Sequence, residues 1–243
     1  MRITSYNMRF GGKGRQQWSK IIENHDPDVI LAQETYAPQE HLPPLFDGDL
    51  HQHAVWHPVA EQPWGSAVFV KSCIPRPISL PDFSGNVVGA EMEDWPWPDS
   101  PGSRLRIFSV HAPKRGDYQK AVNSILDMIL DVADGCDVVI GGDFNLTVSE
   151  RHSSEPLTTS AADRAIQLRL QEEFGLINCW QTANPDKRLT QTLRWTRDRE
   201  TNFHCDGIFV PKSWAGRLLS CHVLAGTEWD DLSDHNPVAA EFQ

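Results

Sequence analysis

The feature that most restricts the fold is a series of short, strongly apolar runs, each too short for a buried helix. Residues 29–32 (VILA) and 138–140 (VVI) are typical, and both favour strands buried on two faces. Further strands are expected at residues 3–8, 67–70, 87–92, 105–110, 190–196, 203–210, 218–224 and 237–242. Because several of these follow one another as hairpins do, the pattern predicts mixed sheets rather than a regular alternation of strands and helices.

Helical patterns are fewer, at residues 16–24, 118–132 and 161–174. The clearest is 118–132, where Ala121, Ile125, Met128, Ile129 and Val132 recur at the spacing of one helix face. An α/β chain with many strands and few helices fits a core of two sheets covered by helices.

The charge balance bears on what the chain can bind. Lys and Arg total 22 against 33 for Asp and Glu, a formal net charge of −11. Such a surface on average repels a phosphate backbone, so tight coating of duplex DNA through many phosphate contacts is not expected. The apolar fraction of 40 % and charged fraction of 23 % are those of a folded protein, and disorder is excluded.

Cysteine usage and the N-terminus indicate the compartment. The 5 cysteines lie far apart without a CxxC pair, which predicts reduced thiols. The first residues lack the apolar region of a signal peptide, and no run approaches the ~20 apolar residues of a membrane span. We therefore expect a cytoplasmic protein with no membrane span, and no obligatory protein partner is indicated.

The apolar runs share one oddity, because polar or ionisable residues stand directly at their ends. These residues are Asn7, Glu34, His111, Asp143 with Asn145, Asp206, and Asp234 with His235. Taken singly, each has an ordinary explanation, since Asp and Asn beside glycine commonly form turns or cap helices. Together, buried strands that end in such groups at a shared edge predict a site.

The residue types at these ends favour a hard metal ion. Oxygen donors from Glu34, Asp234 and Asn7 suit Mg²⁺, with Mn²⁺ as a second possibility. No set of Cys and His has the spacing of a zinc site. Carboxylates beside two histidines also fit metal-assisted hydrolysis, in which one group activates water and others stabilise developing charge.

Six motifs occur in a specific order: Ser5-Tyr6-Asn7, Ile30-Leu31-Ala32-Gln33-Glu34, Ser109-Val110-His111, Gly142-Asp143-Phe144-Asn145, Asp206-Gly207-Ile208-Phe209 and Ser233-Asp234-His235. In this order they resemble the endonuclease/exonuclease/phosphatase superfamily of DNase I-like, metal-dependent phosphoesterases. The resemblance implies a single catalytic domain over residues 1–243. It also implies a four-layer α/β sandwich, with two packed mixed β-sheets flanked by helices.

The resemblance further implies Mg²⁺-dependent cleavage of a phosphoester. Carried over by position, Glu34 is the principal metal ligand, assisted by Asn7 and Asp234. These three positions come from the motifs near each end of the chain.

The remaining motif positions supply the catalytic groups implied by the resemblance. Asp143 orients or deprotonates the attacking water, with Asn145 beside it. Asp206 holds His235, which binds the scissile phosphate or transfers a proton. His111 stabilises or protonates the leaving oxygen.

Basic residues gather near the motif strands, and Lys114, Arg115, Arg194 and Trp195 are the candidates for substrate binding. The indole of Trp195 is suited to stacking on a base, although a core Trp among solvated basic residues is an equal alternative. At the positions of His111 and Lys114 the AP-endonuclease branch carries Tyr and Asn, so the chain departs from that branch.

Three functions remain open from the sequence. The first is a nuclease that cleaves DNA or RNA by metal-assisted attack of water on a phosphodiester. The second is a phosphatase or phosphodiesterase for a small phosphorylated metabolite or a lipid headgroup. The third is a non-catalytic phosphate-binding module, which the complete set of expected acid, amide and histidine positions disfavours.

Overall fold

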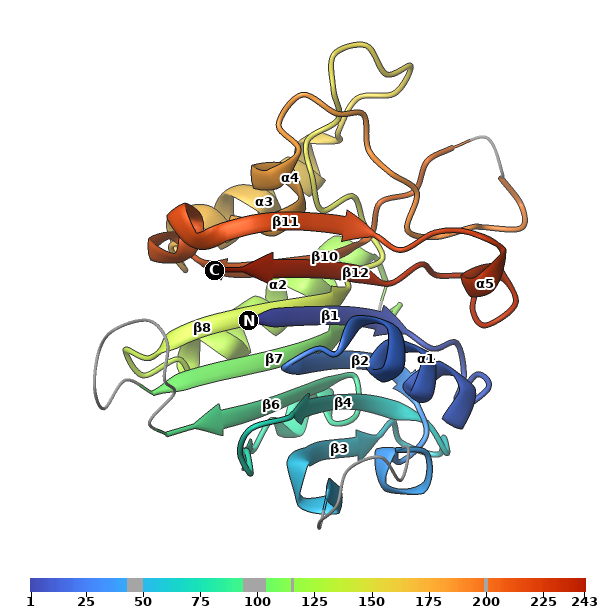
Figure 1. The fold of residues 1–243 in the computed structure, drawn as a ribbon. Coiled ribbons are helices and arrows are strands. Elements are labelled where there is room, and N and C mark those ends of the chain that lie inside the picture. Colours follow the sequence, from blue (N-terminus) through green and yellow to red (C-terminus); the bar gives the residue numbers. More distant parts are fainter. Residues whose placement is uncertain (43–49, 94–103, 115, 199–200) are drawn as a thin grey trace.

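Two six-stranded sheets packed face to face form the centre of the computed structural model, which describes residues 1–42, 50–93, 104–114, 116–198 and 201–243 (Figure 1). The first sheet has the order β11 (Leu218–Val223), β12 (Val238–Phe242), β1 (Arg2–Asn7), β2 (Val29–Thr35), β4 (Gly65–Val70), β3 (Ala54–Pro58). The second has the order β5 (Arg76–Ile78), β6 (Val87–Met92), β7 (Leu105–His111), β8 (Asp137–Asp143), β10 (Asp206–Pro211), β9 (Leu176–Asn178).

Both sheets are mixed, as the order of elements predicts. In each sheet one central pair is parallel, β1 with β2 and β7 with β8. The other strand pairs of both sheets are antiparallel. The carboxyl ends of the parallel strands therefore point the same way within each sheet, which is the arrangement that gathers polar side chains at one edge.

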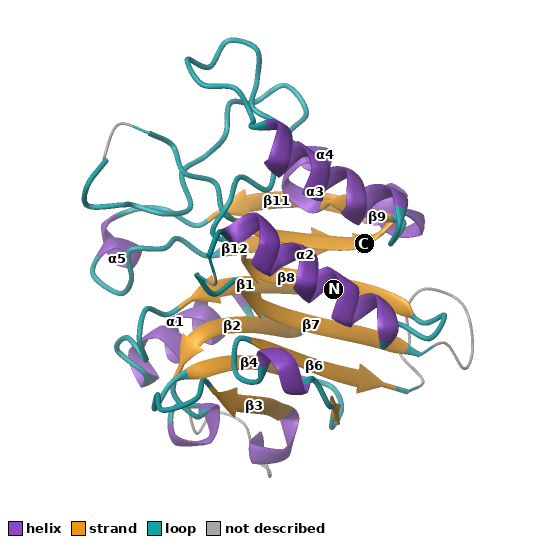
Figure 2. Cartoon of the chain, turned by 180° about the vertical axis from the view of Figure 1, so that it is seen from behind, coloured by secondary structure: helices purple, strands orange, loops and turns teal. Residues whose placement is uncertain are grey.

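Helices cover the outer faces of the sheets (Figure 2). Helix α1 (Arg15–His25) covers the first sheet, and α2 (Tyr118–Asp131) and α3 (Ala161–Glu172) cover the second. Helix α4 (Cys179–Ala183) packs against β10 and β11, one strand from each sheet, and α5 (Thr227–Asp230) lies between β11 and β12 in the chain. The 3₁₀ turns are at Pro38–Glu40, Leu50–His53, Pro81–Phe83 and Lys212–Arg217. The expected helices at 16–24, 118–132 and 161–174 are confirmed, with small differences at their ends. Helix α2 begins at an Asp117 cap that accepts from the backbone N–H of Lys120.

Three apolar clusters separate four layers. One lies between the sheets and includes Leu31, Val139 and Ile208. A second joins the β7/β8 sheet to α2 and α3, and a third joins the β1/β2 sheet to α1. The DNase I-like four-layer α/β sandwich is thereby confirmed.

The two sheets interlock closely behind the strand ends. A Cβ built on Gly141 in β8 would lie 2.5 Å from Cδ1 of Leu31 in β2, so any larger residue there would displace the Leu31 side chain. A short polar bridge crosses the same layer, because Gln33 donates to the hydroxyl of Ser109 (3.0 Å) and Ser109 donates to the carbonyl of Ala32 (2.9 Å). This buried bridge fixes the register of β2 against β7.

The strand predicted for 190–196 is wrong. In this segment Leu193 makes only isolated bridges, to Phe203 and to His235. The hydroxyl of Thr192 accepts from the backbone N–H groups of Cys205 and Asp206 (3.0 and 3.2 Å). Because a side chain satisfies these donors, no ladder forms, and the strand expected at 203–210 begins only at Asp206. Strands β3, β5 and β9 and helices α4 and α5 were not anticipated.

All five cysteines are free, which agrees with the expectation of thiols; Cys179, Cys205 and Cys221 are buried, whereas Cys73 and Cys136 are half-buried. Across the described ranges, none of the helices combines the length and the apolar character that crossing a membrane requires.

Candidate active site

The ends of strands from both sheets meet at one edge, and the predicted polar side chains gather there. Asn7 ends β1, Glu34 lies at the end of β2, His111 ends β7 and Asp143 ends β8. Asp143 pairs with His111 on one side and with Asp206, the first residue of β10, on the other. Sheet packing brings the amide of Asn7 to 3.0 Å from Asp143, so both sheets contribute to one site.

Two backbone features direct side chains into this edge. Gly142 has φ +149°, and a Cβ there would lie 1.9 Å from the carbonyl oxygen of Val110 on the neighbouring strand, so only glycine fits before Asp143. Glu34 has φ +50°, at an irregularity in the register between β2 and β4. A non-glycine residue in this conformation is strained and needs its surroundings to hold it, which is common at functional sites.

Three nitrogen atoms contact the carboxylate of Glu34. Its Oε1 accepts from the amide of Asn7 (3.1 Å) and lies 3.2 Å from Nε2 of His111, while Oε2 accepts from the backbone N–H of Phe10 (2.8 Å). The amide nitrogen of Asn7 thus bridges Glu34 and Asp143, and its oxygen accepts from the backbone N–H of Arg9 (2.9 Å). Asn7 therefore orients the two carboxylates.

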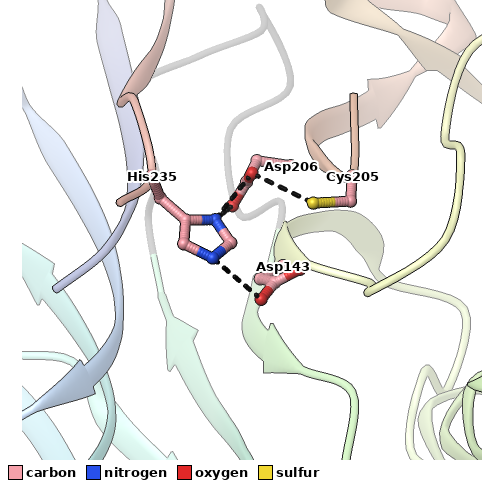
Figure 3. Close-up of side chains that lie close together, drawn as sticks. All are labelled: Asp143, Cys205, Asp206 and His235. Atoms are coloured by element: carbon pink, nitrogen blue, oxygen red, sulfur yellow. Dashed lines mark hydrogen bonds and ion pairs between the residues drawn. The ribbon is translucent and has the colours of Figure 1, made fainter. Parts of the chain in front are cut away.

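A buried charged array occupies the other half of the site (Figure 3). His235 donates from Nδ1 to the carboxylate of Asp206, at 3.1 and 3.0 Å from its two oxygens. Its Nε2 faces Asp143 at 3.7 Å, which is too long for a hydrogen bond. Cys205 donates from Sγ to Asp206 (3.5 Å). His235, Asp206 and Asp143 are all buried.

These contacts set the protonation states. Burial alone would lower the pKa of His235, but the carboxylates of Asp206 and Asp143 outweigh it and raise that pKa to about 10. Burial raises the pKa of Asp143, and the nearby charge of His235 opposes the rise. His235 is therefore a cation at neutral pH, held between two carboxylates.

Asn145 completes the surroundings of Asp143. Its backbone N–H donates to Oδ1 of Asp143 (2.8 Å), and its side-chain amide donates to Oδ2 (3.2 Å) and to the carbonyl of Ala112 (3.1 Å). Asn145 adopts φ +54°, a conformation that Asn tolerates well. Asp143 is thus held by N–H donors on both oxygens, which fixes its orientation.

A cavity of about 440 Å³ adjoins Asn145 and contains further predicted residues. Lys114 and Trp195 line it, together with Phe203 and Cys205. Trp195 is 44 % exposed and meets the ring of Phe203 edge-on, with centroids 5.6 Å apart. Arg115, the remaining basic residue expected at the substrate, lies outside the described residues.

Two predicted residues have partners within the chain. The guanidinium of Arg194 bonds to Oδ1 of Asn236 and to the carbonyl of Ser233, and forms an ion pair with Asp230 (3.2 Å). It therefore holds the loop that carries His235. Asp234 is paired with Arg9 at 3.4 Å.

A second histidine, His204, has a lowered pKa, whereas the pKa of His235 is raised. It is buried, donates from Nδ1 to the carbonyl of Thr190 (2.7 Å) and contacts the ring of Trp180 at 4.7 Å between centroids. Burial lowers its pKa to about 4, so this imidazole is neutral.

The donor set decides where a divalent cation fits. Ligand atoms of Asp143, Cys205, Asp206 and His235 lie within 4.8 Å of one another, as in a metal cluster. There, however, burial keeps the pKa of the Cys205 thiol well above its usual value, and the His235 cation already offsets the carboxylates. Glu34 offers hard oxygens and faces Asp143 across Asn7, so an oxygen-preferring ion fits the Glu34 side better.

Sequence reasoning missed three residues at this edge: Cys205, Phe10 and Trp64. Cys205 is identifiable only through its place before Asp206 at the strand start. Trp64 precedes the first residue of β4, and its ring centroid lies 6.1 Å from that of His111. Phe10 could have been noticed from the sequence as a large aromatic residue in the loop that follows Asn7.

Comparison with known proteins agrees with this geometry. The family model described as "Endonuclease/Exonuclease/phosphatase family" matches residues 4–235. A curated relative, the "Transposon TX1 uncharacterized 149 kDa protein" of Xenopus laevis, is 23 % identical over 139 residues, which are 57 % of this chain and 10 % of the relative. The chain thus spans only a small part of that relative's length.

Solved structures share the fold over the whole chain. The 3′ phosphatase NExo from Neisseria, bound to a product DNA hairpin, superposes with a TM-score of 0.74 at 19 % identity and covers 100 % of this chain and 99 % of its own. The AP endonuclease LMAP from Leishmania major gives 0.69 at 16 % identity, covering 100 % and 87 %. With the motifs assembled at one edge and the family model matched almost end to end, the chain belongs to the endonuclease/exonuclease/phosphatase family.

Proposed function

We propose that this chain is a Mg²⁺-dependent nuclease, a single catalytic domain that cleaves phosphodiester bonds of DNA or RNA by attack of water on the scissile phosphate. The observation that carries the proposal is the buried array of Asp206, His235 and Asp143 beside Glu34. It combines a fixed cation, a buried carboxylate and hard oxygen ligands, which phosphodiester hydrolysis requires.

Glu34 would hold the metal ion, and the family to which the chain belongs is divalent-metal dependent. When bound, such an ion supplies positive charge against the oxygens of the phosphate. Asn7 keeps the carboxylate of Glu34 oriented by its amide hydrogen bond. Mn²⁺ has the same preference for oxygen and is the expected substitute.

Asp143 would position the attacking water and accept its proton. Burial raises its pKa, so it is a stronger base than an exposed aspartate. Asn145 and Asn7 hold its oxygens in place through their N–H groups. Removal of a proton from water by a group fixed in this way contributes about 10²–10⁴-fold to the rate.

His235 would bind the phosphate. Nδ1 is held by Asp206, and the 3.7 Å distance from Nε2 to Asp143 leaves the Nε2–H free to donate to a phosphate oxygen. Across the site, Nε2 of His111 lies beside Glu34, a position from which it would donate a proton to the leaving oxygen. The two histidines thus divide phosphate binding and leaving-group protonation between them.

A nucleic acid is the substrate class that several features favour over a small ester. The cavity beside Asn145 is lined by Trp195, Phe203 and Lys114, a combination of aromatic rings and a cation that suits bases and phosphates. The solved structures of similar fold are named as a 3′ phosphatase bound to a DNA hairpin and as an AP endonuclease.

A substrate panel tests the proposal directly. Plasmid DNA, single-stranded oligonucleotides, RNA and bis-p-nitrophenyl phosphate are incubated with the protein in Mg²⁺, Mn²⁺ or EDTA. The expected result is polynucleotide cleavage with either metal and none in EDTA, with Asp143→Ala as the inactive control. Hydrolysis of the small ester with every polynucleotide left intact would replace the nuclease by a phosphatase or phosphodiesterase of small substrates.

A further inference from the structure

Phe10 occupies a position that neither burial nor backbone geometry favours for phenylalanine. Its side chain is 61 % exposed, although its neighbours at the active-site edge are buried. Its φ is +50°, and the preceding residue Arg9 has φ +55°, so two consecutive non-glycine residues hold the left-handed conformation. Glycine adopts this conformation without strain, and a polar residue would suit the exposure. An aromatic ring there costs the fold stability, which calls for a functional reason.

The ring of Phe10 is fixed beside the catalytic groups. Its backbone N–H donates to Oε2 of Glu34 (2.8 Å), and the next residue, Gly11, donates to the carbonyl of Glu34 (2.5 Å). The phenyl ring contacts the indole of Trp64, with centroids 5.5 Å apart and planes inclined at 58°. The indole in turn contacts His111. We call Phe10 and Trp64 the aromatic pair.

Strand order places the aromatic pair at a defined end of the site. Along the sheet order β12, β1, β2, β4, the strand ends carry His235, Asn7, Glu34 and then Trp64. Trp195 and Phe203 belong to the opposite end, because Leu193 bridges both Phe203 and His235. The catalytic groups therefore lie between two separate sets of aromatic rings.

The surroundings of the aromatic pair match a nucleic-acid strand. Lys13 and Arg15 in the same short segment are exposed cations, suited to phosphates that flank the scissile one, while Arg9 is exposed and paired with Asp234 at 3.4 Å. Exposed aromatic faces next to such cations are how proteins bind single strands, because every base presents a π-face. A small phosphoester that carries neither a ring nor an apolar chain has no group that would stack on this surface.

Resting on the nuclease function proposed above, we propose that Phe10 and Trp64 form a stacking platform for a nucleobase adjacent to the scissile phosphate, on the β4 side of the site. The occupant is an unpaired base of the substrate strand. The platform fixes the strand by stacking, and it contributes to substrate binding rather than to the chemical step.

The test compares Phe10→Gly with Phe10→Tyr and uses Leu219→Ala as the matched control. Leu219 is equally exposed, at 60 %, but lies on β11. The substrates are two short single-stranded oligonucleotides in which one phosphodiester is cleavable and the others are methylphosphonates. One carries all its bases, and the other lacks the bases on both sides of the cleavable bond.

Phe10→Gly is expected to lower kcat/KM on the fully based oligonucleotide by about tenfold, the effect of losing one base–aromatic stack, mainly through KM. Most of that loss should disappear on the oligonucleotide that lacks the flanking bases. Phe10→Tyr should stay close to the unmodified protein, because the ring remains. The Tm of Phe10→Gly should be unchanged or higher, since glycine relieves the left-handed position.

Equal losses on both oligonucleotides, or no loss in Phe10→Gly, would overturn the platform while leaving the nuclease function intact. A lowered Tm in Phe10→Gly, with equal losses, would make Phe10 a structural residue. If the unmodified protein cleaves neither oligonucleotide and leaves plasmid DNA and RNA intact while it hydrolyses bis-p-nitrophenyl phosphate, the nuclease function and the platform are both overturned; cleavage of plasmid DNA or RNA with neither oligonucleotide cut would overturn the platform alone.

Discussion

The two halves of the candidate active site differ in the groups that contact their buried carboxylates. In the half formed by Asp206, His235 and Asp143, the cation is supplied by the protein itself, and its pKa of about 10 keeps it charged. In the half formed by Glu34, Asn7 and His111, the contacts to the carboxylate come from an amide, a backbone N–H and an imidazole. In the first half the positive charge of His235 already balances the carboxylates, so no metal ion is needed there. In the second half, among the described residues, no cation with a raised pKa accompanies Glu34, so this half is suited to bind a metal ion.

The largest expected effect is on the water-activating carboxylate. Asp143→Ala should lower turnover by at least about 10²-fold, because proton transfer by a fixed base contributes that much. Steady-state cleavage rates measure the change, and circular dichroism checks the fold. Asp137→Ala, at the other end of β8, is the matched control and should keep near-normal turnover. Equal turnover in Asp143→Ala and the unmodified protein would remove Asp143 from the mechanism.

Metal dependence separates the two halves. Glu34→Gln should raise the Mg²⁺ concentration needed for half-maximal activity by at least about tenfold, since a carboxylate ligand becomes neutral. Asp206→Asn should lower activity without a comparable change in that concentration. Titrations of activity against Mg²⁺ decide between these outcomes. A larger metal effect in Asp206→Asn than in Glu34→Gln would move the ion to the Asp143, Cys205, Asp206 and His235 cluster.

The stability of the metal-free protein at alkaline pH tests whether His235 is charged between Asp206 and Asp143. The folded pKa of His235 is about 10, above the ordinary 6.5. Its stabilising contribution is therefore full below pH 6.5 and declines as the pH rises towards 10. Urea unfolding at pH 7 and pH 10 should show a smaller loss of unfolding free energy for His235→Gln than for the unmodified protein. Identical losses in the two proteins would argue against a charged His235.

His204 should behave in the opposite direction. Its folded pKa of about 4 lies below 6.5, so the unfolded chain binds a proton that the folded chain rejects. Stability from this residue is full above pH 6.5 and declines as the pH falls towards 4. His204→Gln should therefore lose less unfolding free energy between pH 7 and pH 5 than the unmodified protein, measured by urea unfolding. The same acid loss in both would contradict a neutral buried imidazole.

The smallest effect concerns Arg194, which bonds to the loop that bears His235 and is also predicted to contact the substrate. Arg194→Ala should destabilise the fold by about 1–3 kcal/mol, because the carbonyl of Ser233 and the amide of Asn236 lose a charged donor. Turnover should fall through kcat, as the loop bearing His235 loosens. A selective rise in KM for polynucleotides, steeper at high salt, would instead support direct phosphate binding.

The sequence predicted which polar side chains gather at the active-site edge wherever a residue stands at the end of an apolar run. Asn7, Glu34, His111, Asp143 and Asp206 were identified because strand ends in adjacent positions meet at one edge. Most of the strands followed from the same runs, and helices α1, α2 and α3 followed from apolar residues at helical spacing.

What escaped depends on tertiary partners. The charge of Arg194 is visible in the sequence, but its pairing with Asp230 is not. Asp234 likewise carries the residue type of a metal ligand, and only the fold shows that it pairs with Arg9. The exposure of Phe10 and the failure of 190–196 to form a strand arise from backbone conformation and from hydroxyl hydrogen bonds that periodicity cannot reveal.

The hydrogen bonds from Gln33 to Ser109 and from Ser109 to Ala32 have a consequence for catalysis. Each sheet carries part of the proposed reacting groups, so their alignment depends on how exactly the two sheets pack together. The two hydrogen bonds link β2 of one sheet to β7 of the other, close to the site. A slip of one sheet against the other by a fraction of an ångström would separate Asn7 from Asp143 with every catalytic residue still present. In the proposed mechanism, the alignment of the reacting groups therefore depends on hydrogen bonds of residues that have no proposed contact with the substrate.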